Sequence, residues 1–144
     1  MIFGTKVVVD SVTEKNGKIL VIKRLIPPFV GKYCFPGGHL RHNETVEECV
    51  VRETYEETGI KVLPEEILGV YSKNGRDPRG HIISIVFVCK PLSIKIKSSF
   101  EGFAYWIDLK KLKKEEMGFD HQKILNDYIL WKKKKQTFWS DKNG

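Results

Sequence analysis

A helix with both ends defined is encoded in residues 45–59. Thr45 and Glu48 have the spacing of a capping box, in which each side chain accepts a hydrogen bond from the other residue's backbone N–H. Gly59 follows the run and readily adopts the left-handed conformation that ends many helices. The pattern predicts a helix over residues 45–58, and the rest of the chain must supply the elements that pack against it.

Several segments rich in β-branched residues surround this helix in the sequence. They predict strands at residues 5–12, 18–23 and 81–90, with weaker candidates at residues 67–72 and 103–109. Asn16 and Gly17, between the first two runs, favour the positive φ angles of a tight turn. An N-terminal hairpin is therefore expected.

A second helix is expected over residues 120–134. Asp120 is placed to cap its first turn. Apolar side chains then recur at helical spacing and should face the core, namely Ile124, Leu125, Tyr128, Ile129 and Trp131. Strands interleaved with two helices and hairpins indicate an α/β fold, in which a mixed sheet is covered by helices on both faces.

Length and composition favour one domain over residues 1–144. A chain of 144 residues that is 41% hydrophobic can bury one core, and its polar end should be frayed from about residue 136. No apolar run approaches the roughly 20 residues that span a bilayer, and the N-terminus has no signal-peptide pattern. A cytoplasmic protein with no membrane partner is expected. Cys34, Cys49 and Cys89 form no C-x-x-C pair and should be free, mostly buried thiols.

The chain carries a formal net charge of +7, which favours anionic ligands in general. Much of the excess lies in two lysine-rich runs, residues 110–114 and 132–135, which are typical of solvated helix faces. No RNA-binding or DNA-binding motif accompanies these runs, so nucleic acid is not expected as a partner.

Three carboxylates are concentrated in the first predicted helix. Glu53, Glu56 and Glu57 fall on one side of a helix, where like charges repel by about a few tenths of a kcal/mol per pair. Mg²⁺, with Mn²⁺ as a substitute, would compensate them, and it commonly bridges protein carboxylates and substrate phosphates. The alternative is a solvated acidic face neutralised by Arg52 and nearby lysines. The Phe-Pro-Gly-Gly turn at residues 35–38 favours the metal site, because glycine backbone can approach an ion closely.

These residues together resemble the signature of the Nudix hydrolase superfamily. Gly38 is followed after five residues by Glu44, and after seven more by Arg-Glu-Thr-Tyr-Glu-Glu-Thr-Gly-Ile at residues 52–60. Only Thr54 departs from the pattern, since the family often has a larger aliphatic residue there. The resemblance implies a Nudix-type α/β/α sandwich and attack of water on phosphorus. It also implies that metal is held by Glu53, Glu56, Glu57 and the Gly38 carbonyl, braced by Arg52 and Glu44.

The general base of Nudix enzymes lies either in the signature or on a later loop, and Glu101 is the later-loop candidate here. It precedes residues 103–106, a segment from which relatives project a carboxylate toward the metals. Phe103 stands where many relatives have an acidic residue, and solvation at the surface explains Glu101 almost equally well.

Two further segments, residues 27–33 and 76–81, resemble the Nudix branch that acts on ADP-ribose. The resemblance implies hydrolysis of the phosphoanhydride bond of ADP-ribose to AMP and ribose 5-phosphate. Planar guanidinium groups suit bidentate contacts with diphosphate oxygens, so Arg24 and Arg79 are candidates for substrate binding. The candidates for stacking on adenine are Phe29 and Tyr33.

Other interpretations remain open. Hydrolysis of nucleoside triphosphates, including damaged ones, would use the same signature with a different base pocket. A Nudix module that senses nucleotides or binds nucleic acid without catalysis would not need the intact glutamates. Zinc at His39 and His42 is disfavoured, because no cysteine joins them and the neighbouring carboxylates prefer a harder ion. The sequence leaves the oligomeric state open, and a homodimer is compatible with it.

Overall fold

The computed structural model describes residues 4–143. Its first two strands, β1 (Lys6–Lys15) and β2 (Lys18–Arg24), pair antiparallel around Asn16 and Gly17, whose φ angles are 52° and 79°. Asparagine and glycine tolerate such left-handed angles better than other residues, so the turn follows from the sequence. The predicted N-terminal hairpin is confirmed.

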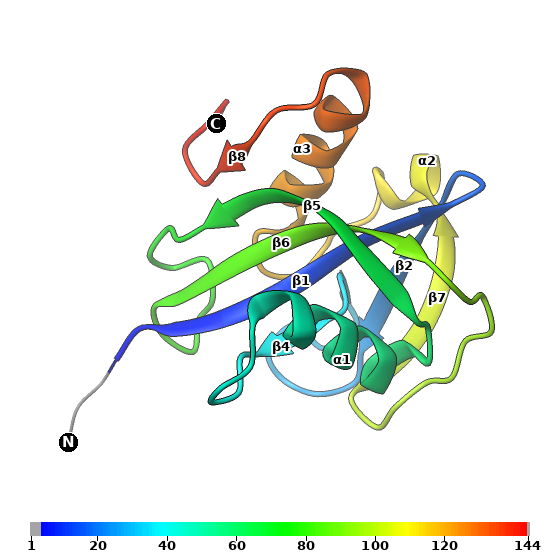
Figure 1. Cartoon of the computed structure of the whole chain (residues 1–144), viewed down its shortest axis with the longest axis horizontal. Coiled ribbons are helices and arrows are strands. Elements are labelled where there is room, and N and C mark those ends of the chain that lie inside the picture. Colours follow the sequence, from blue (N-terminus) through cyan, green and yellow to red (C-terminus); the bar gives the residue numbers. More distant parts are fainter. Residues whose placement is uncertain (1–3, 144) are drawn as a thin grey trace.

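The strands form one mixed sheet (Figure 1). Its main path is β3-β2-β1-β6-β5-β8, while β4 pairs with β1 and β7 pairs with β2. The pairs β1–β6 and β5–β8 are parallel, and the other pairs are antiparallel. The strands after the hairpin are β3 (Tyr33–Cys34), β4 (Gly37–His39), β5 (Val62–Tyr71), β6 (Ile82–Pro91), β7 (Gly102–Asp108) and β8 (Phe138–Trp139).

Two helices cover opposite faces of this sheet (Figure 1). α1 (Val46–Thr58) has the complete capping box between Thr45 and Glu48, and Gly59 ends it with a φ of 74°. α3 (His121–Lys133) covers the other face, and the single-turn helix α2 (Leu109–Leu112) follows β7. The predicted α/β sandwich with a mixed sheet is confirmed.

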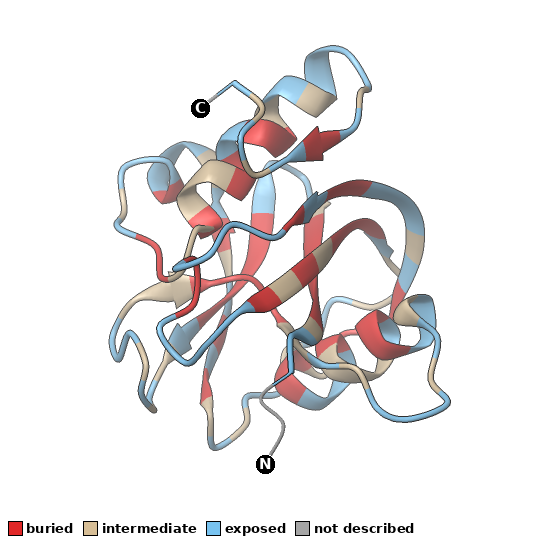
Figure 2. Cartoon of the chain, turned by 90° about the vertical axis from the view of Figure 1, so that its left-hand side faces the viewer, coloured by how far each residue is buried: buried red, intermediate tan, exposed pale blue. Residues whose placement is uncertain are grey.

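Alternating residues of the central strands supply two separate cores. In β2, Ile19 belongs to the cluster that packs against α3, and Leu20 belongs to the cluster that packs against α1. Val86 and Phe87 of β6 divide in the same way. Figure 2 shows the buried stretches of strand and helix gathered in the interior. Successive side chains of a strand point to opposite faces, so a sheet covered on both sides requires such nearly continuous apolar runs.

Several elements differ from the sequence prediction. β5 begins at Val62 rather than at residue 67, because two irregularities in its pairing with β6 interrupt the alternation on which the prediction depended. β3, β4, β8 and α2 were not predicted. Each contains only two to four residues, which is too short to display a hydrophobic period.

Two expectations about the C-terminal part are wrong. Asp120 makes no side-chain capping bond at the start of α3, because its carboxylate accepts hydrogen bonds from Arg76 at 2.9 and 2.7 Å. The tail is not frayed where β8 pairs with β5: Phe138 is buried, and Ser140 Oγ accepts hydrogen bonds from the backbone N–H groups of residues 72 and 73. The last residue, Gly144, lies outside the described residues.

Other sequence expectations are confirmed. The three cysteines are free and buried, and the lysines of residues 110–114 and 132–135 are exposed. Ile124, Leu125 and Tyr128 are buried in the core, with Ile129 and Trp131 packed against its edge. Within residues 4–143, no helix is both long enough and apolar enough to cross a membrane.

Candidate active site

A cavity of about 240 Å³ lies where the sheet, α1 and the start of α3 meet. It brings together six of the residues singled out in the sequence, which come from β2, β4, α1 and the loops before β6 and β7. These residues are Arg24, Gly38, Glu53, Glu57, Arg79 and Glu101. Glu56, Phe29 and Tyr33 do not line the cavity.

Two threonines fix the glutamate-bearing part of α1. Thr54 and Thr58 are fully buried, and the Thr58 hydroxyl donates to the Thr54 carbonyl at 2.6 Å. Thr54 Oγ1 also lies 2.9 Å from the hydroxyl oxygen of Ser11 in β1, so one of the two donates to the other. Thr54 is the position that departs from the Nudix signature. Its hydroxyl makes a buried polar contact with the sheet that an aliphatic side chain could not make.

The glycine turn lies directly against the glutamates. A Cβ atom on Gly38 would overlap the Glu53 carboxylate, and one on Gly37 would overlap the β1 backbone at Val9 and Asp10. The Gly37 N–H donates to Glu57 Oε1 at 2.8 Å. The turn therefore needs glycine for close approach rather than for a positive φ angle.

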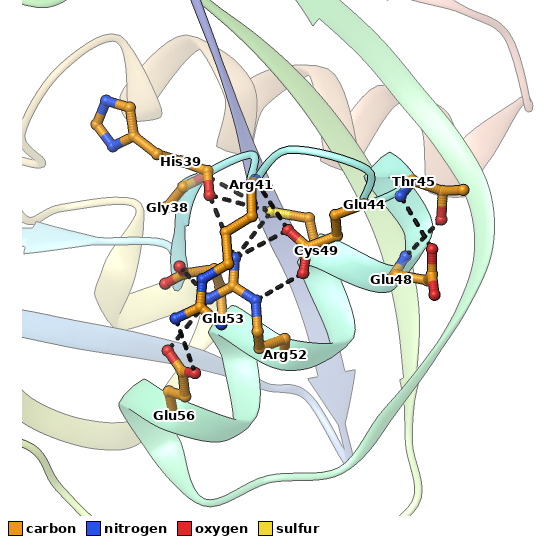
Figure 3. Close-up of polar contacts among 10 residues, drawn as sticks. All are labelled: Gly38, His39, Arg41, Glu44, Thr45, Glu48, Cys49, Arg52, Glu53 and Glu56. Atoms are coloured by element: carbon orange, nitrogen blue, oxygen red, sulfur yellow. Dashed lines mark hydrogen bonds and ion pairs between the residues drawn. The ribbon is translucent and has the colours of Figure 1, made fainter.

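Arg52 joins the charged residues of the signature into one network (Figure 3). Its Nε and Nη2 donate to Glu44 at 2.6 and 3.0 Å, and its Nη1 donates to Glu53 at 2.7 Å. Nη2 also donates to the carbonyl of His39 at 3.2 Å. The hydrogen bonds from Arg52 lower the pKa of Glu44 to about 2, so Glu44 remains a charged brace.

Glu56 lies apart from the other two signature carboxylates. Its side chain is 48% exposed and faces Arg52 Nη1 at 3.3 Å and Arg41 Nη2 at 3.7 Å (Figure 3). Helical spacing puts Glu56 near Glu53, as expected, but the two arginines hold its carboxylate on the outer side of α1. Only Glu53 and Glu57 reach the cavity from this helix.

Burial and mutual repulsion disfavour the charged forms of the cavity carboxylates. Burial is the main cause that raises the pKa of Glu57 well above its ordinary value, and Glu101 and Glu53 raise it further. Burial also raises the pKa of Glu53, against the opposing effect of Arg52, and Glu56 and Glu101 contribute in the same direction as burial. A positive ligand in the cavity would relieve this cost.

The donor set suits a hard divalent cation, although it is not assembled as a complete coordination shell. Within residues 4–143, no three acidic, histidine or cysteine side chains are already gathered around one point, and this includes His39 and His42. Arg52 occupies oxygens of Glu53 and Glu56. The carboxylates of Glu53, Glu57 and Glu101 nevertheless line one cavity with the Gly38 turn, and hard cations prefer such oxygen donors.

The raised pKa of Glu57 leads to a prediction for the metal-free protein. A carboxyl whose pKa is raised by folding stabilises the fold most in acid, and this contribution is lost as pH rises through the raised pKa. In EDTA at neutral pH, Glu57→Gln should therefore melt at a higher temperature than the wild type, and the difference should shrink as pH is lowered. Thermal unfolding across this pH range tests the prediction. A wild type that is the more stable protein at neutral pH would contradict it.

The two candidate substrate arginines are anchored by different groups. Arg24 donates to the carbonyls of Pro28 at 2.5 Å and Pro27 at 3.3 Å. Arg79 binds the carboxylate of Asp77 through Nε at 3.0 Å and Nη2 at 2.8 Å. Its side chain is 47% exposed whereas that of Asp77 is buried. The buried carboxylate therefore anchors Arg79, while part of the guanidinium group remains accessible to solvent.

The two candidates for stacking on adenine lie outside the cavity, and an aromatic residue that the sequence analysis did not select lines it instead. Phe29 is exposed and packs on Phe119 with ring centres 4.8 Å apart, and Tyr33 contacts Tyr105 at 6.3 Å. Phe119 itself lines the cavity. At the entrance to α3 the sequence analysis selected Asp120 as a helix cap, so the missed signal was the aromatic residue directly before it.

Buried polar residues at the floor of the cavity were also missed. Asp10 accepts a hydrogen bond from Ser84 Oγ at 2.5 Å and lies 3.7 Å from His121 Nε2. His121 Nδ1 accepts the Phe35 N–H at 2.9 Å, so the proton of the neutral ring is on Nε2 and faces Asp10. Arg76 also lines the cavity and pairs with Asp120. Asp10 interrupts an apolar strand, which was the one local sign of this polar floor.

Known proteins are similar to this chain in both sequence and fold. A family model described as the NUDIX domain matches residues 4–128. An ADP-ribose pyrophosphatase of Methanocaldococcus jannaschii is 48% identical over 127 residues, which cover 88% of this chain and 74% of that protein. The crystal structure of a NUDIX hydrolase from Nitrosomonas europaea has a TM-score of 0.85 at 24% identity, covering 97% of this chain and 80% of that chain.

A further solved structure is a bifunctional NMN adenylyltransferase/ADP ribose pyrophosphatase from Francisella tularensis, complexed with AMP and a manganese ion. It has a TM-score of 0.73 at 25% identity and covers 90% of this chain but 42% of that chain. The family match spans most of the sequence, and it includes the glycine turn, α1 and the cavity carboxylates. The chain is a member of the Nudix hydrolase family.

Proposed function

We propose that this Nudix hydrolase cleaves the phosphoanhydride bond of ADP-ribose and releases AMP and ribose 5-phosphate. The observation that carries the proposal is the single cavity that combines the carboxylates of Glu53, Glu57 and Glu101 with the guanidinium groups of Arg24 and Arg79. Carboxylates suit a metal and arginines suit a diphosphate. The 48% identity to a protein named ADP-ribose pyrophosphatase supports the choice of substrate.

The proposed cofactor is Mg²⁺, with Mn²⁺ as a substitute. Glu53 and Glu57, together with the Gly38 carbonyl, would hold it in the cavity, and Glu56 would join them by leaving its partners Arg41 and Arg52. A divalent cation would activate water and stabilise the charge that develops on the bridging oxygen. The Francisella tularensis neighbour, of which this chain covers 42%, was crystallised with AMP and a manganese ion, the same classes of ligand as those proposed here.

The protein's own groups have separate roles in this proposal. Glu101 accepts the proton from the attacking water, because it reaches the cavity from the loop before β7. Arg24 and Arg79 bind the diphosphate, and Arg52 keeps Glu53 oriented through their 2.7 Å hydrogen bond. No covalent enzyme intermediate is needed, since water attacks phosphorus directly.

The alternative of nucleic-acid binding finds less support from the C-terminal lysines. Lys132 pairs with Glu14 at 2.8 Å, and Lys135 pairs with Glu66 at 3.1 Å. Lys132 also lies over the Tyr128 ring and Lys135 over the Trp131 ring. These contacts give the lysines a structural role on the surface of α3.

A panel of substrates tests the proposed function. The catalytic efficiency kcat/KM is measured at one magnesium concentration for ADP-ribose, dinucleotides and nucleoside triphosphates. ADP-ribose should be the preferred substrate. A clear preference for triphosphates would retain the Nudix chemistry and overturn the substrate, whereas the absence of magnesium-dependent hydrolysis across the panel would contradict the enzymatic role.

The variant Arg79→Ala should raise the KM for ADP-ribose by about tenfold, the usual size of a lost charge-assisted contact. The melting temperature should fall only slightly, because the 2.9 Å hydrogen bond from the backbone N–H of residue 79 to Asp77 does not depend on the side chain, and Asp77 also lies near Arg76. Lys32→Ala is the matched control, since it removes an exposed ion pair with Glu116 outside the cavity. If both variants have the wild-type KM, Arg79 belongs to a solvated turn.

A further inference from the structure

Phe119 has a backbone conformation that a bulky residue rarely adopts. Its φ angle is 54°, in the left-handed region, at the position two residues before α3 begins. The neighbouring backbone is fixed on both sides, since Gly118 N–H donates to the Tyr33 carbonyl at 2.8 Å and His121 N–H donates to the Gly118 carbonyl at 3.1 Å. Strained residues of this kind persist where the surrounding structure holds them, often at ligand sites.

The Phe119 ring lies within contact distance of both candidate substrate arginines. The guanidinium carbon of Arg24 lies 5.3 Å from the ring centre, and that of Arg79 lies 5.6 Å from it. Both distances are within the range of cation–π attraction. One aromatic ring therefore contacts two cations that come from β2 and from the loop before β6.

The two arginines together carry more positive charge than their other contacts balance. Among residues 4–143, Arg24 forms no ion pair, and its hydrogen bonds go to the neutral carbonyls of Pro27 and Pro28. Arg79 pairs with Asp77 on one side and remains about half exposed on the other. Two like charges held against one ring repel each other, and an anionic ligand would compensate them.

The Phe119 ring is also packed against two other aromatic rings. Phe29 lies 4.8 Å from it between ring centres, and His121 lies 5.3 Å from it. Phe29 also has a positive φ angle, 62°. The two phenylalanines that pack against each other are therefore both in the left-handed region. This support leaves the ring little freedom to move away from the arginines.

We infer that Phe119 is a positioning residue, which holds Arg24 and Arg79 at the separation that receives the diphosphate of the substrate. The inference rests on the proposed function, because it assumes that the arginines bind a diphosphate. Phe119 acts through the two guanidinium groups and not by stacking on the base. It therefore controls substrate affinity, while the carboxylates that line the same cavity control turnover.

The first test is Phe119→Leu, which keeps an apolar side chain and removes the π face. The KM for ADP-ribose should rise by about tenfold, from the loss of two cation–π contacts, while kcat changes by less than about twofold. Phe119→Tyr keeps the aromatic ring and should have the KM of the wild type. Phe103→Leu is the control, because it removes a half-exposed phenylalanine that lies outside the cavity.

A second variant guards against a folding defect. Asparagine is tolerated at left-handed φ angles, so Phe119→Asn should keep the loop conformation and the melting transition while showing the same rise in KM. A variant that melts normally and has the wild-type KM would overturn the inference.

A double-mutant cycle separates positioning from direct stacking on adenine. When Arg24 and Arg79 are both replaced by alanine, adding Phe119→Leu should raise KM no further, because the ring has nothing left to position. An additional rise of about tenfold in that background, equal to its effect in the wild type, would overturn the inference and assign the ring to the base. The proposed function is judged separately, by whether the wild type cleaves ADP-ribose. If it prefers another nucleotide, the same ratios are measured on that nucleotide, and if it cleaves none, the Kd for ADP-ribose replaces KM.

Discussion

Replacing Glu57 by glutamine should lower kcat by about a hundredfold or more, and the protein should remain folded. Glu57 is buried, and its Oε1 accepts the Gly37 N–H, a bond that the amide oxygen of glutamine can still make. The substitution therefore preserves shape and removes the negative charge proposed to hold the metal. Magnesium-dependent hydrolysis of ADP-ribose and thermal unfolding are measured on the same preparation.

Glu47→Gln is the matched control for this experiment. Glu47 lies on the exposed first turn of the same helix, away from the cavity, so its activity should be that of the wild type. Binding of Mn²⁺ to the metal-free proteins supplies a second readout, and it should weaken for Glu57→Gln alone. Wild-type turnover in a folded Glu57→Gln protein would remove Glu57 from the mechanism.

The second large effect is expected for Glu101→Gln. Loss of a general base usually lowers turnover by about a hundredfold to ten-thousandfold, and kcat for ADP-ribose should fall within this range. KM should change little, because Arg24 and Arg79 are untouched. The carboxylate position makes this variant informative, since Glu101 lines the cavity and raises the pKa values of both Glu53 and Glu57.

Glu65→Gln provides the comparison, because Glu65 is an exposed carboxylate on β5 outside the cavity. The pH profile distinguishes two explanations for a slow Glu101→Gln enzyme. Loss of the base should make kcat depend less on pH across the acidic limb, whereas a displaced loop should leave the profile unchanged in shape. If kcat stays above about half of the wild-type value, the base must instead be one of the carboxylates on α1.

The parts of the fold with a regular local pattern could be predicted from the sequence. The capping box at Thr45 and Glu48 fixed the start of α1, and Asn16 with Gly17 fixed the first hairpin. Both depend on contacts within a few residues, which the sequence displays directly. β8 could not be predicted in this way, since its two residues are held by pairing with β5, a partner distant in the chain.

Asp120 illustrates how a distant partner overrides a local preference. Its position before α3 suits a capping carboxylate, but Arg76 lies 44 positions earlier and offers two charge-assisted hydrogen bonds. A helix start read from sequence alone could not include this competitor. The prediction of the helix was correct and the prediction of its capping bond was wrong.

The candidate site divides in a similar way. The spacing of Glu53 and Glu57 on one helix was enough to predict that they would lie together, and Gly38 followed from the signature. Glu56 shares that spacing, yet Arg41 on the preceding loop draws its carboxylate outward. Phe119 joins the cavity because the entrance to α3 is hydrogen-bonded to β3, which is distant in the sequence, so no local pattern could indicate its contacts with the arginines.

Water is proposed to attack phosphorus in ADP-ribose, and hydrolysis in oxygen-18 water tests this step most directly. Both products are identified by mass after a reaction with magnesium. We expect AMP and ribose 5-phosphate, with the label in the phosphate of one of them, and the labelled product identifies the phosphorus that is attacked. Label found only on a ribose carbon would contradict this mechanism, because it would show cleavage of a carbon–oxygen bond instead of the phosphoanhydride.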